Sequence, residues 1–478
     1  MNHPPLILAL LLAALAGCAS QGDSKTVTAL RNPASLGELN LALPTGTPSV
    51  SGEYWQQLGD PQLDALIAKA WAEAPSLQLA DARIRRAAAL TQLADSAREP
   101  QLNANFDSTS QRFTENGMIP APVAGSWRTN NRLALDAGID LDLWGRYRAG
   151  LKSAEALLRE AEVEKQAAKL ALASALARGW VEYDRLYRQL DHLDALITTR
   201  GELENLQRIR VKAGLDPDFD RSQQRFGIAA LRTERAATLT QLALQRDRLM
   251  TLAGQSQAED GQLGRPQIRS SLDARLPSQL PADLLGNRPD VLASRWRVEA
   301  ASHDIEAARA QFYPNVNLTA FLGFSSLGLE NLLDSHARIL GGGPAIRLPI
   351  FEGGRLRANL ATRNADHDAA VAQYNATLLD ALHEVVDQAR SLEGMQQQNA
   401  MAREALTAAE RGVQLTQTRV ERRLASRVQL LGAQLQVLAQ QRVLTDLHAR
   451  RLDAALGLQR ALGGGFSPDA NPFTLAAN

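Results

Sequence analysis

The feature that most constrains this chain is an internal duplication. Pro75 and Pro289 each open a run of helix-forming residues, and Pro100 and Pro314 close these runs at the same distance along the sequence. A proline in the first turn of a helix is tolerated because its missing N–H has no partner inside the helix. A segment of alternating polar and apolar residues follows each closing proline. The sequence therefore predicts two halves built to one plan.

Very long helices follow in both halves. No proline interrupts residues 146–213 or 355–423, and a helix of that length extends ~100 Å. Amphipathic helices rarely exceed about 25 residues alone, so these helices need neighbours packed along them in the manner of a coiled coil. The breaks Leu215–Asp218 and Arg422–Ser426 end them, and a return helix follows each break. Each half is predicted as short helix, strand, loop, strand, long helix, tip and return helix.

Four segments are predicted as β-strands, at about residues 100–113, 130–144, 314–325 and 337–351. The second places one set of side chains on an apolar face, namely Leu133, Leu135, Ala137, Ile139, Leu141 and Leu143. Its other face is acidic and carries Asp136, Asp140 and Asp142. Strands of this length and alternation are typical of membrane β-barrel walls. The alternative is a pair of amphipathic hairpins that cover a soluble core.

Aromatic residues near the strand ends favour the membrane interpretation. Trp144, Phe312, Tyr313 and Phe351 would mark one side, and Phe113, Trp127 and Phe324 the other. Four strands cannot close a membrane barrel, and an open edge in lipid leaves unpaired backbone groups. Closure therefore needs other copies of the chain, two copies giving eight strands and three giving twelve. The strand at 130–144 is expected to pair with the strand before it and then with a neighbouring subunit.

The N-terminus predicts export and acylation. An apolar run over residues 6–16 leads into Leu15-Ala16-Gly17-Cys18, which matches the bacterial lipobox. Cys18 is the only cysteine and would carry diacylglycerol and an N-acyl chain, with an ordinary secretory signal as the alternative. Ala19 at the next position favours the outer membrane. The predicted boundaries are a signal peptide 1–17, a tether 18–60, a first repeat 61–253, a linker 254–283, a second repeat 284–465 and a tail 466–478.

Charge and motif content exclude several classes of function. Lysine plus arginine and aspartate plus glutamate both number 52, so no general nucleic-acid binder is expected. The seven histidines are scattered, and no phosphate-binding loop or nucleophile motif occurs. We therefore expect no enzyme activity, no metal and no cofactor beyond the lipid on Cys18.

Three motifs carry a family resemblance together with the lipobox. They are Arg288-Pro289-Asp290, the run Ala308–Pro314 and the ending Leu462–Phe466. The chain resembles the outer membrane factor family, the TolC-like exit ducts of tripartite efflux pumps, in its NodT-type lipoprotein branch. The resemblance implies a mainly α fold with a membrane β-barrel portion: a homotrimer whose twelve-stranded barrel continues into a twelve-helix periplasmic α-barrel. It also implies a periplasmic adaptor, an inner-membrane pump of the resistance-nodulation-division type, and outer membrane lipids as partners.

The resemblance further implies that the two helical tips constrict the tunnel and bind the adaptor. The first tip is Val211–Asp216 and the second is Val420–Ala425. The implied residues are Gly214, Leu215, Asp216 and Asp220 at the first tip, and Arg423, Leu424, Arg427, Val428 and Gly432 at the second. Asp220 either supplies carboxylates to the aperture or is a solvated acid at a helix start. Family members often have aspartate where this chain has Gly432, so Val428 becomes the expected constriction.

The predicted function is a passive exit duct for drugs or other toxic small molecules. A lumen lined by Asp136, Asp140 and Asp142 would mildly prefer cations. Two alternatives remain: an exit duct for type I protein secretion, and a coiled-coil outer membrane lipoprotein or adaptor without a pore.

Overall fold

The computed structural model describes residues 25–33, 52–256, 263–269 and 286–466. Its contacts divide the chain into two compact units. Unit 1 comprises residues 1–30, 83–161 and 294–374, and unit 2 comprises residues 31–82, 162–293 and 375–478. The predicted signal peptide, Cys18, most of the tether, much of the linker and the C-terminal tail lie outside the described residues.

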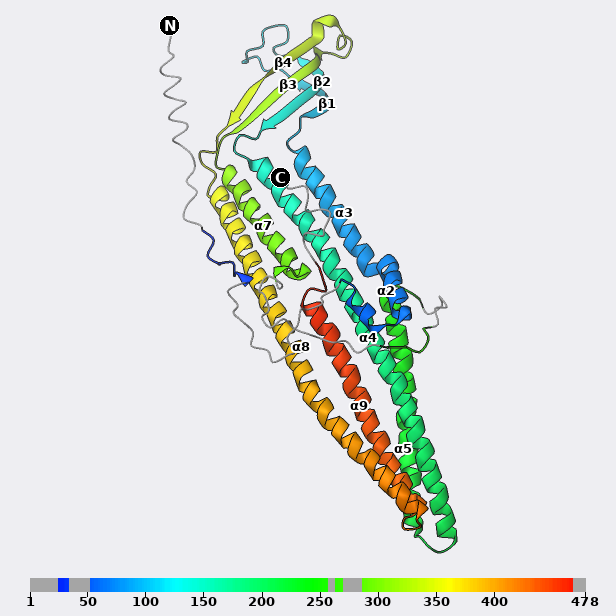
Figure 1. The fold of residues 1–478 in the computed structure, drawn as a ribbon. Coiled ribbons are helices and arrows are strands. Elements are labelled where there is room, and N and C mark those ends of the chain that lie inside the picture. The colour runs from blue at the N-terminus through cyan, green and yellow to red at the C-terminus, as the bar shows by residue number, and fades with distance from the viewer. Residues whose placement is uncertain (1–24, 34–51, 257–262, 270–285, 467–478) are drawn as a thin grey trace. The chain divides into compact units, whose positions relative to one another are not determined.

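The helices confirm the duplicated plan (Figure 1). Corresponding helices have equal lengths in the two halves: 22 residues in α3 (Pro75–Ser96) and α7 (Pro289–Ala310), 67 in α4 (Arg146–Lys212) and α8 (Arg355–Glu421), and 35 in α5 (Asp218–Leu252) and α9 (Arg427–Ala461). In the first half, a short helix, α2 (Pro61–Glu73), precedes α3. Among the described residues, no helix combines the length and hydropathy that a membrane crossing requires.

The four strands lie in unit 1 and form one antiparallel sheet in the order β1-β2-β3-β4. Their bounds are Gln101–Arg112, Trp127–Leu141, Asn315–Leu327 and Arg338–Arg347. The prediction that β2 pairs with a neighbouring subunit is wrong, because β3 of the same chain occupies its second edge. The edges of the sheet are instead β1 and β4.

Two predicted strands also end early. The segment predicted over 130–144 forms β2 over Trp127–Leu141, because Asp142 turns to the start of α4. The segment predicted over 337–351 ends at Arg347, shortly before Pro349, which has no N–H to donate to a ladder.

The register joins apolar residues of all four strands on one face of the sheet. Residues directly opposite each other in an antiparallel pair point to the same side of the sheet. The apolar set of β2 meets the apolar sets of its neighbours in the pairs Leu135 with Ala104, Leu133 with Phe106, Leu135 with Leu322 and Ile139 with Leu318. Leu322 in turn lies opposite Leu340 of β4. The predicted alternation is therefore confirmed at these positions, whereas the same face becomes polar in the pairs Ser108 with Asn131 and Ser110 with Thr129.

The core of unit 1 includes a cluster between α7 and α8. It consists of Ile305, Ala308, Phe312, Leu356 and Leu360. Phe312 is 2% exposed, so it is a core residue and not one of the interfacial aromatics that the sequence predicted. Trp144 and Tyr313 do come together at one end of the sheet, where their rings stack with centroids 4.7 Å apart. The Trp144 indole donates to the Pro314 carbonyl at 2.8 Å.

Unit 2 is built around α4, and the segment before α2 completes its core. A 3₁₀ helix, η2 (Tyr54–Leu58), buries Tyr54, Trp55 and Leu58. Asp60 is 2% exposed and accepts hydrogen bonds from the Trp180 indole at 2.9 Å and the Gln267 N–H at 2.6 Å. The end of the predicted tether, residues 52–60, is therefore part of the folded body, because it fills this core and supplies its buried acceptor.

Candidate functional site: helical tips and polar strand face

The first tip, Val211–Asp216, is a tight reversal between α4 and α5. Gly214 takes a left-handed conformation with φ of 73°, and the Leu215 N–H donates to the Arg210 carbonyl at 2.9 Å. This bond pattern is a Schellman motif, in which a left-handed residue ends a helix and satisfies its last carbonyls. Asp216 closes the turn through two hydrogen bonds from the Arg210 guanidinium, at 2.7 and 2.8 Å. This ion pair lowers the pKa of the Asp216 carboxyl.

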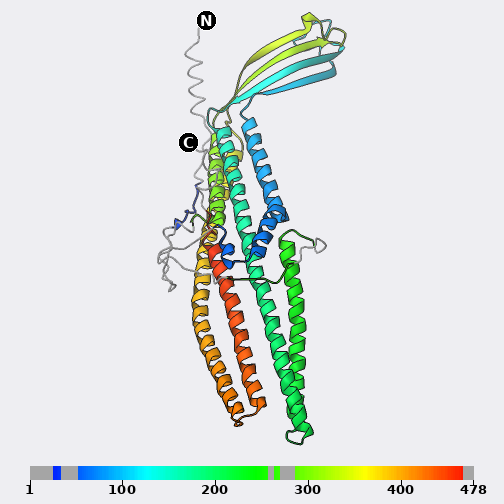
Figure 2. The ribbon, with the colours of Figure 1, turned by 45° about the vertical axis from the view of Figure 1, so that its right-hand side comes forward.

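The second tip, Val420–Ala425, repeats this backbone with other side chains. Arg423 takes the left-handed conformation with φ of 60°, and the Leu424 N–H donates to the Arg419 carbonyl at 2.7 Å. Ser426 and Gln429 form a capping box that starts α9. Ala425 stands where the first tip has Asp216, so the described second tip lacks the ion pair. Both tips lie at the same end of unit 2 (Figure 2).

Each tip presents one leucine to solvent. Leu215 is 65% exposed and Leu424, at the matching position, is 66% exposed. The duplication thus places an exposed leucine at the same position of both hairpins. These leucines could not be identified as exposed from the sequence, since a Schellman motif often packs this residue against its own helix.

The remaining predicted tip residues lie on the first turns of the return helices. Asp220 stands in the first turn of α5 beside Asp218, where a carboxylate interacts favourably with the helix dipole. Arg427 begins α9 and lies 3.6 Å from the Glu202 carboxylate of α4. Val428 is half-buried one turn before Gly432. A Cβ atom on Gly432 would meet nothing within 4 Å, so an aspartate fits there sterically.

The predicted acidic strand face is not a free cluster of carboxylates. Asp136 accepts two hydrogen bonds from the Arg132 guanidinium, at 3.0 and 2.5 Å, and a third from the Asn105 amide at 2.7 Å. The same guanidinium lies over the ring of Phe321, 5.7 Å from its centroid, as in a cation–π contact. The negative charge of Asp136 is thus balanced by an arginine on the same strand.

The other two aspartates serve the start of α4. Asp142 lies beyond the end of β2 and accepts the backbone N–H groups of Tyr147 and Arg148 at 3.1 and 2.9 Å. Asp140 accepts the Tyr147 hydroxyl at 2.6 Å. Asp142 therefore satisfies N–H groups in the first turn of α4 that have no intrahelical partner, and Asp140 orients the Tyr147 side chain.

The polar face of the sheet as a whole is balanced in charge. The register places three acids and three bases on it: Asp107, Asp136, Asp140, Arg128, Arg132 and Arg347. On the described strands these three arginines offset the three aspartates, and the mild preference of the lumen for cations stays a prediction. Two of these arginines could be placed from the sequence, since Arg128 and Arg132 have the same parity as Asp136 along β2.

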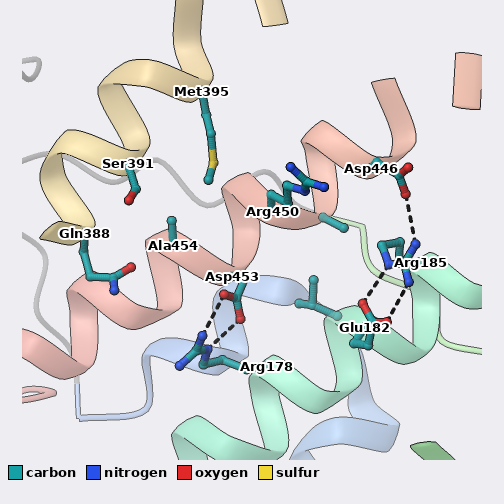
Figure 3. A pocket seen from close by; sticks show the side chains of 12 residues that line it. Arg178, Glu182, Arg185, Gln388, Ser391, Met395, Asp446, Arg450, Asp453 and Ala454 are labelled. Atoms are coloured by element: carbon teal, nitrogen blue, oxygen red, sulfur yellow. Dashed lines mark hydrogen bonds and ion pairs between the residues drawn. The ribbon is translucent and has the colours of Figure 1, made fainter. Parts of the chain in front are cut away.

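Ion pairs also join α4 to α9 in unit 2. Arg178 donates to both oxygens of Asp453, at 2.6 and 2.8 Å, and Arg185 donates to Asp446 at 3.0 Å (Figure 3). They border a polar cavity of about 640 Å³ between α4, α8 and α9. Ion pairs thus link α4 and α9 over about two helical turns.

Comparison with known proteins decides the assignment. The model of the outer membrane efflux protein family matches residues 66–255 and 280–464. The chain belongs to the outer membrane efflux protein family. The multidrug resistance outer membrane protein MdtP of Escherichia coli is 30% identical over 422 residues, which cover 87% of this chain and 86% of the relative. The fusaric acid resistance protein FusA of Burkholderia cepacia is 35% identical over 75% of this chain and 69% of the relative.

Solved structures of bacterial membrane proteins show the same fold. The outer membrane protein VceC of Vibrio cholerae has 34% sequence identity and a TM-score of 0.79, over 88% of this chain and all of that one. A membrane protein of Pseudomonas aeruginosa has 27% identity and a TM-score of 0.81. The resemblance drawn from the sequence is confirmed, and with it the mainly α fold, the outer membrane location and the function as an efflux channel. The family consists of channel proteins, which removes the pore-free lipoprotein as an interpretation.

Proposed function

We propose that three copies of this chain close a twelve-stranded β-barrel and a twelve-helix α-barrel, and so form a passive outlet for small molecules. The observation that carries the proposal is a sheet with an apolar face and two edges, β1 and β4. Unpaired edge groups in lipid cost several kcal/mol each. Pairing β1 of one copy with β4 of the next removes both edges at once. The relatives named for drug and fusaric acid resistance favour small molecules over secreted proteins as the cargo.

The energy for transport would come from partners and not from this chain. A periplasmic adaptor would dock on the two tips and connect them to an inner-membrane pump, of the resistance-nodulation-division type. The matched exposure of Leu215 and Leu424 supports docking, because a partner that covers them removes apolar surface from water. In a trimer, the two leucines of each chain would form a ring of six equivalent contacts.

The aperture at the tips would be apolar and basic, without an acidic ring at Gly432. Val428 would line it one turn nearer the tip, with Arg423 and Arg427 beside it. Asp216 is already paired with Arg210, so it adds little free negative charge at the first tip. Cys18 would carry diacylglycerol and an N-acyl chain, and Cys18→Ala should abolish labelling by radioactive fatty acid.

The trimer can be tested with the full-length protein in detergent. We expect a band on a semi-native gel at about three times the chain mass, which heating converts to the monomer. In a strain that lacks its own outer membrane channel, the gene, expressed with its adaptor and pump, should restore resistance to fusaric acid or a multidrug substrate. A chain that stays monomeric after membrane extraction and restores no resistance would contradict the proposal.

The balanced polar face predicts a lumen with weak ion selectivity. In planar bilayers, Arg132→Ala should raise the cation-to-anion permeability ratio, because it leaves Asp136 unpaired in all three copies. Asp136→Asn should shift the ratio the other way. Equal ratios in wild type and both variants would show that this strand face does not line the conducting path.

A further inference from the structure

A segment near the N-terminus, residues 25–32, is bound to α8 through its backbone. The Val27 N–H donates to both oxygens of the Asp368 carboxylate, at 3.0 and 3.1 Å, and the Thr28 N–H donates to one at 2.9 Å. Two successive N–H groups are thus aimed at one carboxylate, and hydrogen bonds to an ionised acceptor are among the stronger ones. These N–H groups lower the pKa of the Asp368 carboxyl, so it is ionised at neutral pH.

Asn375 provides a second acceptor further along the same helix. Its side-chain oxygen accepts the Arg31 N–H at 2.9 Å. Residues seven apart lie on one face of a helix, about 10 Å apart along its axis. The segment from Val27 to Arg31 spans up to about 13 Å when extended. The spacing of the two acceptors therefore suits the length of chain between the two bound N–H groups.

Apolar burial does not hold this segment in place. Val27 is 88% exposed and Leu30 is 49% exposed, so the apolar side chains point largely to solvent. What α8 recognises is the row of backbone donors. A single carboxylate is accordingly the main determinant of whether the segment stays on the helix.

We propose that Asp368, assisted by Asn375, is a binding site on α8 for the segment that follows Cys18, and that it ties the lipid anchor to the folded body. The role of the anchor rests on the proposed acylation of Cys18. Nine residues lead from Cys18 to Val27, and each advances the chain by at most about 3.5 Å, giving a reach of roughly 30 Å. Asp368 lies 13 residues into α8, about 20 Å from the helix start that follows β4. At full extension, this length would exceed the distance to the helix start by about 10 Å.

Limited trypsin digestion of the full-length protein in detergent tests the binding site. Lys25 and Arg31 flank the bound segment, and mass spectrometry of the released peptides gives the cleavage rate after each. The variant Asp368→Ala/Asn375→Ala should be cleaved at least about fivefold faster, because digestion follows the population of the released segment. Asp366→Ala is the matched control, since its carboxylate pairs with Arg363 at 3.4 Å instead.

A reciprocal pair of variants changes the segment and leaves α8 intact. Val27→Pro removes the N–H that Asp368 accepts, whereas Val27→Ala retains it. Only the proline variant should accelerate cleavage after Lys25 and Arg31. Rates within twofold of wild type for both Val27→Pro and the Asp368/Asn375 variant would overturn the binding site.

A shortened tether tests the link to the lipid. Deletion of residues 20–24 leaves a reach of about 14 Å, less than the ~20 Å to the helix start. In acylated protein embedded in membrane the deletion should open the site and speed cleavage, whereas in Cys18→Ala protein it should not. Equal rates in the two backgrounds would overturn the link to the lipid. Loss of drug resistance with normal cleavage rates would instead count against the proposed efflux function.

Discussion

The two halves of the chain pack the end of a return helix against the start of a short helix in the same way, but with different chemistry. In the first half, Gly254 follows α5, and a Cβ atom there would lie 2.9 Å from the Glu73 carbonyl oxygen, beside Ala74. In the second half, Gly463 follows α9 and faces Arg288, with 3.7 Å between an added Cβ and the Arg288 Cγ. The first contact is close backbone packing, and the second is built around a charged side chain.

Arg288, the charged residue of the second contact, is deeply buried, with 5% of its surface exposed. Its guanidinium donates to Asp290 at 2.8 Å, to Glu384 at 2.9 Å and to the Ala461 carbonyl at 2.9 Å. Ala461 ends α9, where a carbonyl has no intrahelical partner. Burial alone would lower the pKa of Arg288, but the two carboxylates raise it. The duplicated backbone fixes where elements meet, and the chemistry of the contact can differ.

The largest effect is expected from Arg288→Ala. It leaves Glu384, Asp290 and the Ala461 carbonyl without their shared donor, and breaking a buried ion pair costs about 3 kcal/mol when its partners are partly exposed. Hydrogen exchange at the end of α9 should rise sharply. Arg460→Ala is the control: it also loses a bond to Glu384, but its side chain is far more exposed. Similar exchange in both variants would show that the buried arginine has no special role.

The two glycines should differ in the opposite sense. Gly254→Ala adds a methyl group into contact with the Glu73 backbone and imposes a positive φ on alanine, for a cost of about 2 kcal/mol. Gly463→Ala meets only the positive φ, for about 1 kcal/mol. Thermal unfolding of the two purified variants, side by side, measures this difference. If Gly463→Ala proved the more damaging, the first half would not depend on close packing.

The tips also differ in chemistry between the halves, but here the first half has the ion pair and the second does not. Arg423→Gly should stabilise the second tip by at most about 1 kcal/mol, because glycine adopts a positive φ without strain but loses more entropy on folding. The Leu424 amide closes this turn, so its hydrogen exchange should slow. Faster exchange would mean that the arginine side chain stabilises the turn by a contact that outweighs its backbone strain.

Much of this architecture could be predicted because it depends on local signals. Matched prolines, unbroken helical patterns and alternating strands located the helices and the sheet to within a few residues. The pairing of β2 with β3 could not be predicted, because the two strands are separated by the whole first hairpin. The pairing of Asp136 with Arg132 could have been predicted, because both lie on one face of β2, but the contact of Asp136 with Asn105 of β1 depends on the register.

The smallest expected effect is a pH dependence of amide exchange at the first tip, which a single substitution should introduce at the second tip. Arg210 lowers the pKa of Asp216, so this carboxylate stabilises the first tip above its unfolded pKa of about 3.9, and the stabilisation is lost as pH falls through its folded value. Exchange of the Leu215 amide, corrected for intrinsic rates, should therefore speed up below about pH 4, and Asp216→Ala should remove that dependence. Ala425→Asp places a carboxylate opposite Arg419 and should give the Leu424 amide the same dependence. If the second tip gained none while the first kept its own, the ion pair would depend on side chains particular to the first tip and not on the shared backbone.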